Sequence, residues 1–337
     1  MRKFDVVTLA HGGGGTASAE LVARIFLPHF ENEFLRSLSD GALLPPIAGR
    51  VAVSTDSFVI DPIFFPGGDI GSLAVHGTVN DVSMCGGSPL YLTAGFIIEE
   101  GMPMADLERI AASMGAAARE AGVRIVAGDT KVVARGGADK IFINTAGIGV
   151  VPEGVTIGAQ RVRAGDKVIL SGSLGDHGIS VLIKRKGLKF DADIVSDSRP
   201  LNGLVKTMLA VEPDIHMMRD PTRGGLAAVL CEVARQGNVG ILIEEQKIPV
   251  LENVRAVCEL LGMDVMHVAN EGKLVAFIPP ASADKVLAAM RAHPHGKDAV
   301  IIGTVGTVPN GRVEMKTGFV GNRIIEPLVG DQLPRIC

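Results

Sequence analysis

Short runs of β-branched and other apolar residues alternate, in the first half of the chain, with longer segments whose apolar residues recur at helical spacing. The short runs predict β-strands, because Val, Ile, Thr and aromatic residues favour an extended backbone. The longer segments predict helices, and Pro103 marks the start of the second one. The predicted strands span residues 51–57, 90–99, 123–127 and 141–151, and the predicted helices span about 69–85 and 105–121.

The second half repeats this pattern after an irregular segment. Residues 152–166 contain a proline, several glycines and charges of both signs, so we place a domain boundary there. Strands and helices that alternate along the chain are typical of an α/β domain. The predicted strands lie at 167–172, 241–245, 273–279, 299–305 and 312–318, and the helices near 177–186, 201–210, 225–236, 250–261 and 283–292.

The last segment of the chain predicts a flexible tail. Glycines and prolines recur there so closely that no regular element fits, and the chain ends in a free cysteine, Cys337. Fully extended, the tail spans up to about 65 Å at roughly 3.3 Å per residue, enough to carry Cys337 across either domain. The predicted organisation is an N-terminal domain over 1–152, a C-terminal α/β domain over 153–317 and a mobile tail over 318–337.

Composition and charge exclude several classes of protein. Apolar residues make up 47% of the chain and aromatic residues only 4%, so the cores must be built from Val, Ile, Leu, Ala and Met. The net charge of −4 leaves no basic face for phosphates, so nucleic acid is not expected as a partner. No run of 18 apolar residues and no signal peptide are present, so we expect a cytoplasmic protein without membrane binding.

Three internal cysteines, Cys85, Cys231 and Cys258, lie in apolar, helix-like segments without C-x-x-C spacing. In a reducing cytosol we expect them to be reduced, buried thiols. Cys337 is the exception, because a terminal residue cannot pack into a core in the same way.

A run of four glycines, Gly12, Gly13, Gly14 and Gly15, follows a strand-like segment near the start of the chain. Four glycines are entropically costly to order, and amides without a neighbouring Cβ can line up on an anion such as phosphate. The alternative is an N-terminal segment without a fixed structure. The run is not a Walker loop, because no Lys-Ser or Lys-Thr follows at the required spacing.

Four aspartates, Asp56, Asp81, Asp129 and Asp220, stand in or at the ends of apolar runs. Any one of them can simply cap a turn or a helix. Together, and beside a glycine-rich segment, they suggest binding of a magnesium–nucleotide complex. Mg²⁺ prefers oxygen ligands and is usually held by one or two carboxylates together with phosphate oxygens.

Several motifs resemble one known family along essentially the whole chain. They are TDSF at 55–58, NDV at 80–82, AGDTKVV at 127–133, MRDPTRGG at 218–225, ANEG at 269–272 and the terminal PRIC at 334–337. With them the chain resembles the HypE family, the carbamoyl dehydratases of [NiFe]-hydrogenase maturation. That family belongs to the ATP-binding superfamily of aminoimidazole ribonucleotide synthetase and selenophosphate synthetase. The PRIC terminus distinguishes it from the other members.

The resemblance implies a two-domain, PurM-like α/β (α+β) fold. It implies a β-rich N-terminal domain that forms a homodimer, an α/β C-terminal domain and a flexible tail. It also implies ATP and Mg²⁺ in a cleft between the two halves, with Asp56, Asp81, Asp129 and Asp220 at the acidic positions. Gly12–Gly15 match the phosphate-side segment of the family.

The resemblance further implies a role for Cys337. In the family this thiol receives a carbamoyl group from the carbamoyltransferase HypF. ATP then phosphorylates the amide oxygen, which turns a poor leaving group into a good one, and loss of phosphate and a proton leaves an S-thiocyanate. The cyanide passes to iron on a HypC–HypD scaffold and becomes a ligand of the hydrogenase metal centre.

The elimination needs a proton acceptor, and two residues match family positions near the thiol. We assign Glu271 as the acceptor and Lys131 as its partner or as a phosphate contact, with Asn270 in the nucleotide site. The alternatives are phosphate neutralisation by Lys131 and a turn role for Glu271. Arg219 and Arg223, on either side of Asp220, either clamp phosphates or face solvent.

Two rival functions remain open at this point. A small-molecule ATP-dependent synthetase or kinase of the same superfamily would use the same aspartates without a terminal cysteine. A scaffold protein would use the tail only to dock partners, with ATP as a structural ligand.

Overall fold

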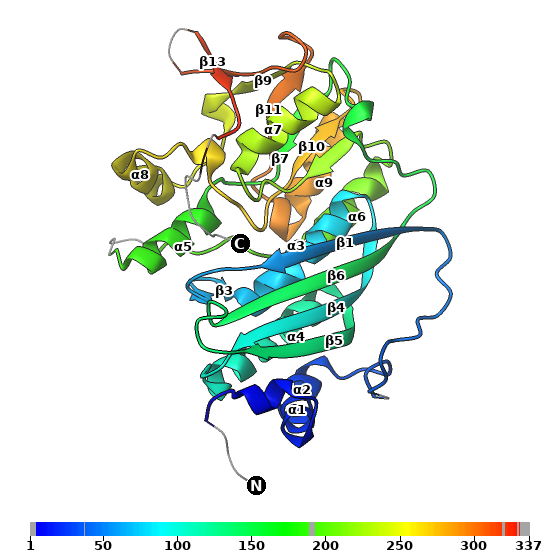
Figure 1. The fold of residues 1–337 in the computed structure, drawn as a ribbon. Helices are drawn as coiled ribbons and strands as arrows, with labels where there is room; N and C mark the ends of the chain where they lie inside the picture. Colours follow the sequence, from blue (N-terminus) through cyan, green and yellow to red (C-terminus); the bar gives the residue numbers. More distant parts are fainter. Residues whose placement is uncertain (1–4, 37, 189–192, 319–320, 329, 331–337) are drawn as a thin grey trace.

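The computed structural model describes residues 5–36, 38–188, 193–318, 321–328 and 330. The chain forms two halves, each built around a β-sheet, which stack on one another (Figure 1).

The sheet of the first half has four strands in the order β1-β6-β4-β5. Only the neighbours β4 and β5 run parallel, and a long helix, α4, connects them. The helices α3 and α4 pack together and cover one face of this sheet (Figure 1). The elements are β1 (Arg50–Phe58), β2 (Phe64–Phe65), β3 (Gly68–Asp69), α3 (Ile70–Met84), β4 (Ser88–Glu99), α4 (Met104–Ala121), β5 (Arg124–Val133) and β6 (Ile141–Val151).

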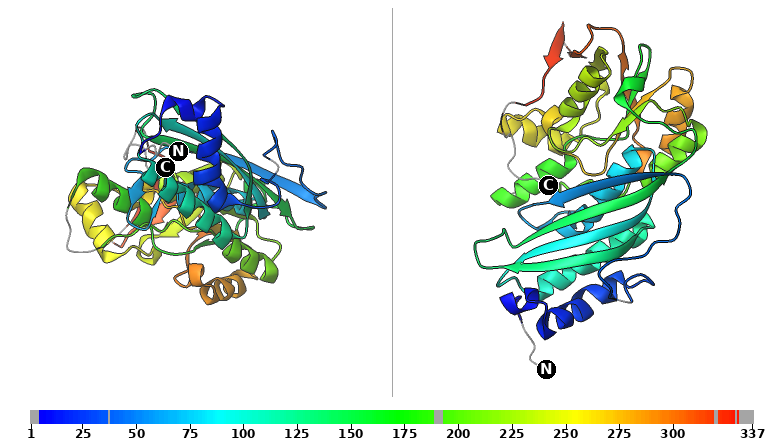
Figure 2. Two further views of the ribbon diagram at one scale, coloured as in Figure 1. Left: turned by 90° about the horizontal axis from the view of Figure 1, so that it is seen from below. Right: turned by 45° about the vertical axis from the view of Figure 1, so that its right-hand side comes forward.

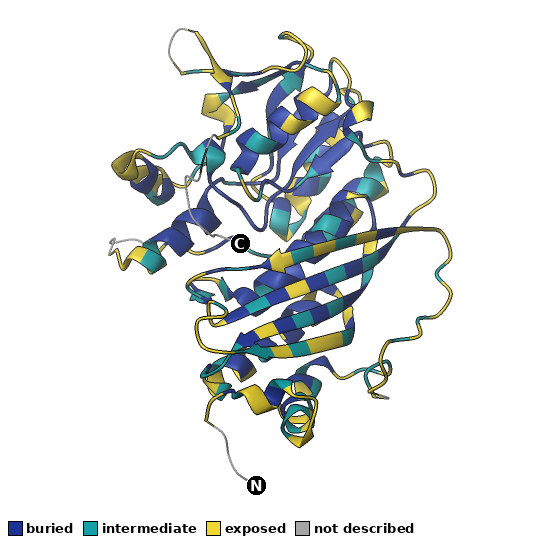
Figure 3. Ribbon diagram, viewed as in Figure 1, coloured by how far each residue is buried: buried dark blue, intermediate teal, exposed yellow. Residues whose placement is uncertain are grey.

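The alternating pattern of the strands explains the first core. Along β6, buried residues alternate with less buried ones, as the stripes in Figure 3 show. Successive side chains of a strand point to opposite faces, so one face of the sheet packs on the helices. Asp69 caps α3, because its Oδ1 accepts the N–H groups of Gly71 at 2.8 Å and Ser72 at 3.1 Å. The helix is buried on nearly all sides, since it contacts the sheet, α4 and the second half.

A short helical segment precedes the first sheet and was not predicted. It comprises η1 (Leu9–Gly12), α1 (Thr16–Leu21), the π-helical turn η2 (Val22–Phe26) and α2 (Leu27–Phe30). It packs beside α4 and β5, at the lower end of the view in Figure 1. Its buried residues Leu21, Ile25, Phe26 and Phe30 join the first core.

The second half is a seven-stranded mixed sheet in the order β13-β12-β9-β11-β7-β10-β8. Figure 2 shows helices on both sides of it. The strands are β7 (Lys167–Leu170), β8 (Met217–Arg219), β9 (Ile241–Glu244), β10 (Val275–Ile278), β11 (Val300–Val305), β12 (Val313–Lys316) and β13 (Asn322–Ile325). The helices are α5 (Asp176–Lys186), α6 (Asn202–Val211), α7 (Gly225–Gln236), α8 (Glu252–Leu261), α9 (Ala283–Ala292), and the 3-10 turns η3 (Ala159–Arg161), η4 (Glu245–Lys247), η5 (Val265–His267) and η6 (Pro294–Gly296).

The central strands of this sheet are buried on both faces. On β10, Val275 and Phe277 belong to a core with α7, whereas Ala276 and Ile278 belong to a core with α6 and α9. A continuous apolar run is therefore what this strand requires, since both of its faces are covered.

Two predictions about the chain's elements were wrong. The tail after residue 317 was expected to lack regular structure, but β13 pairs antiparallel with β12, from Val313 opposite Ile325 to Lys316 opposite Asn322. After β13 the chain can extend at most about 40 Å at roughly 3.3 Å per residue, less than the 65 Å expected. Cys85 was expected to be buried, but it is exposed, because α3 ends at Met84.

The structure lengthens another predicted element. The strand expected over 123–127 continues as β5 to Val133, because its pairing with β4 continues through Asp129 and Lys131. Within the described part of the chain, no helix combines the length and the apolar character needed to cross a membrane.

Candidate functional site

An acidic cluster forms where the two halves meet. We use this name for Asp56 of β1, Asp81 of α3, Asp220 after β8 and Glu271 in the loop before β10. Asp220 is 8% exposed and Glu271 is 3% exposed. The hydroxyl of Ser54 donates to Oδ2 of Asp81 at 2.8 Å.

The carboxyl groups of the cluster affect one another's protonation. Burial, together with the negative charges of Asp81 and Asp56, raises the pKa of Asp220 to about 7. Burial raises the pKa of Glu271 well above its usual value, and the charges of Asp220 and other acidic residues add to this effect. Burial is also the main cause that raises the pKa of Asp56 and of Asp81. Holding several ionised carboxylates together in a buried site raises the electrostatic free energy unless a cation or protons neutralise them.

Two arginines border the cluster. Arg219 is paired with Glu232 at 3.1 Å between Nη2 and Oε2. Arg223 is exposed, and its charge lowers the pKa of both Asp56 and Asp81. A positive group therefore stands near the cluster on its solvent side.

Asp129 and Lys131 lie apart from the acidic cluster within one chain. They are on β5, and three strand spacings of about 4.8 Å separate β5 from β1, so Asp56 is roughly 14 Å away. The Nζ of Lys131 lies 2.7 Å from each carboxylate oxygen of Asp129. This exposed pairing lowers the pKa of Asp129. The structure thus divides the predicted site residues into two groups.

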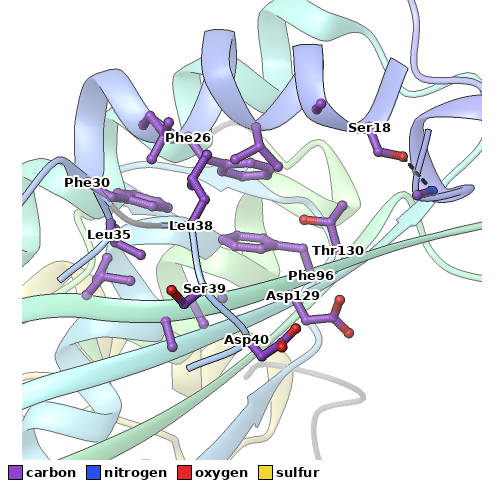
Figure 4. Close-up of a pocket in the computed structure, with 18 of the residues that line it drawn as sticks. Ser18, Phe26, Phe30, Leu35, Leu38, Ser39, Asp40, Phe96, Asp129 and Thr130 are labelled. Carbon is purple, nitrogen blue, oxygen red and sulfur yellow. Dashed lines mark hydrogen bonds between the residues drawn. The ribbon is translucent and has the colours of Figure 1, made fainter. Parts of the chain in front are cut away.

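A cavity of about 470 Å³ adjoins this second group (Figure 4). Its apolar side includes Phe26, Phe30 and Phe96, with a ring-centroid distance of 4.6 Å between Phe26 and Phe96. Its polar side includes Asp129 and Lys131, and the glycine segment also lines it. Such a cavity can accept a flat ring on one side and charged groups on the other.

The four glycines are ordered, and two of them are required by the fold. A Cβ on Gly12 would lie 2.6 Å from the backbone nitrogen of Val132, so only glycine fits against β5. Gly14 has φ of +76°, and its N–H donates to Oγ of Ser18 at 2.9 Å. A Cβ at Gly13 or Gly15 meets little or nothing, and both residues are exposed. The N–H of Gly13 donates to the carbonyl oxygen of Ala10 at 3.4 Å.

Both polar atoms of the Asn270 side-chain amide form hydrogen bonds with backbone groups. Its Nδ2 donates to the carbonyl oxygens of Pro221 at 3.1 Å and Val268 at 2.9 Å, and its Oδ1 accepts the N–H of Gly175 at 2.8 Å. These contacts hold the loop that carries Glu271. Glu271 itself has a buried Oε1 that finds no hydrogen-bond partner among the described residues.

No group of three or more His, Cys, Asp or Glu side chains among the described residues is arranged to hold a metal ion by itself. The acidic cluster still fits Mg²⁺, because this ion commonly takes one or two protein carboxylates and completes its shell with phosphate oxygens and water. The mutual repulsion of Asp56, Asp81 and Asp220 is what such a cation would relieve. Cys337 lies outside the described residues.

Three polar residues support the site but were not selected as site residues from the sequence: Asn80, Asp197 and Lys273. Asn80 stands next to a predicted site residue, and Lys273 opens the apolar run LVAFI. In the sequence, a lysine directly before an apolar run was a signal that an acidic partner lies close by. The structure agrees, because Lys273 is only 6% exposed and a buried lysine needs a charged partner.

Comparisons with known proteins agree with this architecture. Residues 39–151 match the AIR synthase related protein N-terminal domain, and residues 163–316 match the corresponding C-terminal domain. Carbamoyl dehydratase HypE from Azotobacter vinelandii is 56% identical over 333 residues, which is 98% of this chain and 97% of that protein. The expected α/β, PurM-like fold class is confirmed.

Two solved structures are similar over nearly the whole chain. A crystal structure of the hydrogenase maturation protein HypE in complex with ATP has a TM-score of 0.94 and 52% identity, covering 98% of this chain and 99% of that one. A crystal structure of a HypE–HypF complex has a TM-score of 0.81 and 49% identity, covering 91% of this chain and 99% of that one. The resemblance drawn from the motifs is therefore confirmed.

Proposed function

Because this chain belongs to the HypE family of carbamoyl dehydratases, we propose that it dehydrates an S-carboxamide on its own Cys337 to an S-thiocyanate at the expense of ATP. The product supplies the cyanide ligand for the iron of [NiFe]-hydrogenase. The observation that carries the proposal is the similarity along the full length to proteins of this name, including one solved with ATP. A small-molecule synthetase or kinase would not account for it.

The reaction needs two bond changes at the carboxamide. The amide oxygen attacks the γ-phosphorus of ATP, and ADP leaves. The nitrogen gives up its first proton to solvent as the phosphorylated intermediate forms. The carbon–oxygen bond then breaks with loss of inorganic phosphate while the acceptor takes the second proton from nitrogen, and a carbon–nitrogen triple bond remains. The protein must therefore hold phosphates and provide a group that accepts protons.

We propose that one or two of the carboxylates of Asp56, Asp81 and Asp220 ligate Mg²⁺, which in turn would hold the phosphates of ATP. The cation would neutralise charge as the phosphoryl group is transferred. Arg223 stands on the solvent side of the cluster, where it can contact a phosphate oxygen. The glycine segment lines the cavity beside Asp129 and Lys131, so any phosphate contact that it makes would, like theirs, come from a second protomer.

Glu271 is the proposed proton acceptor. Its buried Oε1 has no hydrogen-bond partner among the described residues. Burial and the neighbouring carboxylates raise the pKa of its carboxyl group, so the group would act as a base after a cation has neutralised those carboxylates and allowed it to ionise. Asn270 is assigned here to hold the loop rather than the nucleotide, because its amide is used by backbone groups.

Lys131 and Asp129 are proposed to complete the site of a second protomer. Within one chain they are too far from the acidic cluster to contact the same phosphoryl group or thiol, but a homodimer built through the N-terminal sheets can bring them to it. HypF is the proposed carbamoyl donor, since a similar protein has been solved in complex with it. We also propose a HypC–HypD scaffold as cyanide acceptor, a cytoplasmic location and a domain limit at residue 152. The limit expected at residue 317 is not kept, because β13 belongs to the second sheet.

The test follows the C-terminal peptide by mass spectrometry with carbamoyl phosphate, the carbamoyltransferase and Mg-ATP. Cys337 should gain one carbamoyl group and then lose one water only when hydrolysable ATP is present. The Cys337→Ser variant is the control, and it should bind ATP but gain nothing. Absence of any modification in the wild type would reject the proposal.

A further inference from the structure

The loop that carries Glu271 rests on a buried ionic group of the second half. The Nζ of Lys273 lies 3.1 Å from Oδ2 of Asp197 and 3.3 Å from Oδ2 of Asp176. All three side chains are at most 7% exposed. Two carboxylates thus share one ammonium group away from water. Such groups are weak evidence for stability, because desolvation offsets much of the attraction.

Both carboxylate oxygens of Asp197 accept hydrogen bonds from the loop that carries Glu271. Its Oδ1 accepts the backbone N–H of Glu271 at 3.1 Å, and its Oδ2 accepts the N–H of Gly272 at 3.3 Å. Hydrogen bonds to a charged acceptor are stronger than those between neutral groups. Lys273 keeps the carboxylate of Asp197 ionised, since its charge lowers the pKa of Asp197 against the effect of burial.

Asn80 holds the same peptide from the first half. Its Nδ2 donates to the carbonyl oxygen of Glu271 at 3.4 Å and to that of Arg199 at 3.1 Å, and its Oδ1 accepts the N–H of Leu201 at 2.7 Å. Asn80 is 1% exposed and directly precedes Asp81 on α3. The backbone of Glu271 is thereby tied to the helix that carries another member of the acidic cluster.

Gly272 shows how closely these segments approach. A Cβ at this position would lie 1.8 Å from the carbonyl oxygen of Asp197, so no other residue fits there without displacement. The peptide is held at Glu271 N–H, Glu271 C=O and Gly272 N–H, while Oε1 of the Glu271 side chain has no partner. These backbone contacts fix the peptide from which the Glu271 side chain extends.

We propose that Asp197 and Asn80 are positioning residues, which hold the Glu271–Gly272 peptide from two sides so that the Glu271 carboxyl group meets the substrate in the cluster. This inference deepens the proposed function and rests on it. Neither residue touches the reacting atoms. Their loss should slow the chemical step and leave ATP binding nearly unchanged.

The test compares Asp197→Asn with Asp176→Asn in the full-length protein carbamoylated on Cys337. Each variant removes one of the two carboxylates from Lys273, but only Asp197 bonds to the loop of Glu271. We expect Asp197→Asn to lower the single-turnover rate of water loss about 10- to 100-fold, because small displacements of a catalytic group have such effects. The ATP concentration for half-maximal rate should stay within about threefold, and Asp176→Asn should keep its rate within about threefold of the wild type.

Two outcomes would overturn the proposal: a wild-type rate in Asp197→Asn, or an equal loss of rate and ATP affinity in both variants. If Asp197→Asn does not fold, Asn80→Ser replaces it, since that change leaves the ionic group intact. Its rate should fall about tenfold at unchanged ATP dependence, and an unchanged rate would contradict the positioning role.

Hydrogen exchange of the ATP-free protein separates this inference from the proposed function. The amides of Glu271 and Gly272 should exchange faster in Asp197→Asn than in Asp176→Asn, whether or not the protein dehydrates a carboxamide. Equal exchange in the two variants would reject the positioning role. A wild-type protein that never loses water from carbamoylated Cys337 would reject the proposed function instead.

Discussion

The acidic cluster and the Asp129–Lys131 pair contain similar charged groups in opposite surroundings. Asp220 and Glu271 are buried with other carboxylates, and their pKa values are raised. Asp129 is exposed beside a lysine, and its pKa is lowered. The cluster therefore gains free energy when it takes up a proton or a cation, whereas the pair is already neutralised. Acidic residues that look equivalent in the sequence therefore differ in pKa and in their need for a cation.

The largest expected effect is on the chemistry of the cluster. Glu271→Gln should slow water loss from carbamoylated Cys337 by about 100-fold or more, since general base catalysis typically contributes that much. ATP binding should persist, because the amide has nearly the same shape. Single-turnover mass spectrometry measures the rate, and Glu153→Gln, at an exposed turn, is the matched control. A rate for Glu271→Gln within a few-fold of the wild type would assign the proton to another group.

The second prediction tests whether the acidic cluster and the Asp129–Lys131 pair of one active site come from different protomers. Lys131→Ala and Glu271→Gln should each be inactive alone. After the two homodimers exchange subunits, about a quarter of the wild-type activity should return, because half of the dimers are mixed and each has one complete site. No recovery after verified exchange would place both residues in one chain's site.

The third prediction concerns stability and pH at Asp220. Because its folded pKa is about 7, above the usual 3.8, the folded state holds the proton more tightly. The contribution of Asp220 to stability should therefore fall as the pH rises from about 4 to about 7, since this group binds fewer protons in the unfolded state over that range. Asp220→Asn should raise the free energy of unfolding at pH 8 by up to a few kcal/mol, at about 1.4 kcal/mol per pKa unit.

Urea denaturation at pH 5 and pH 8, without magnesium, measures this effect. The gain from Asp220→Asn should be clearly smaller at pH 5 than at pH 8. Equal gains at both values would show that the carboxyl group is not held protonated by its neighbours.

The smallest effect is expected for the exposed pair. Asp129→Asn should change the free energy of unfolding by less than about 1 kcal/mol, because exposed ion pairs contribute little. The change should shrink further in 1 M salt, which screens surface charges. A loss of several kcal/mol in the same urea experiment would mean that the two regions are not as different as the structure indicates.

The fold was largely predictable where periodicity is strong. The helix predicted at 69–85 is α3, Ile70–Met84, and the helix predicted at 225–236 has the same limits as α7. The N-terminal helices were missed, because they follow four glycines and contain Pro28. The strands β8 and β13 have only three and four residues. β8 pairs with β10, which is distant in the sequence, and β13 pairs with the neighbouring β12 across a glycine-containing turn.

The residues around the site were only partly predictable. Asp56, Asp81, Asp220 and Glu271 were selected from motifs, and the structure brings them together. Asp129 was selected by the same reasoning but lies across the sheet. Asp197 has no sequence signal of its own, since its role arises from the backbone amides that a distant loop presents to it.

The sequence by itself determined most of the longer strands and helices, the two-part organisation and the family, because these depend on local periodicity and short motifs. Only the tertiary structure decided which acidic residues share a buried site and which are exposed and paired. Burial and the spacing between charges set their protonation, and both are properties of segments far apart along the chain. The support of Glu271 by Asp197 and Asn80 could be seen only once the two halves were packed together.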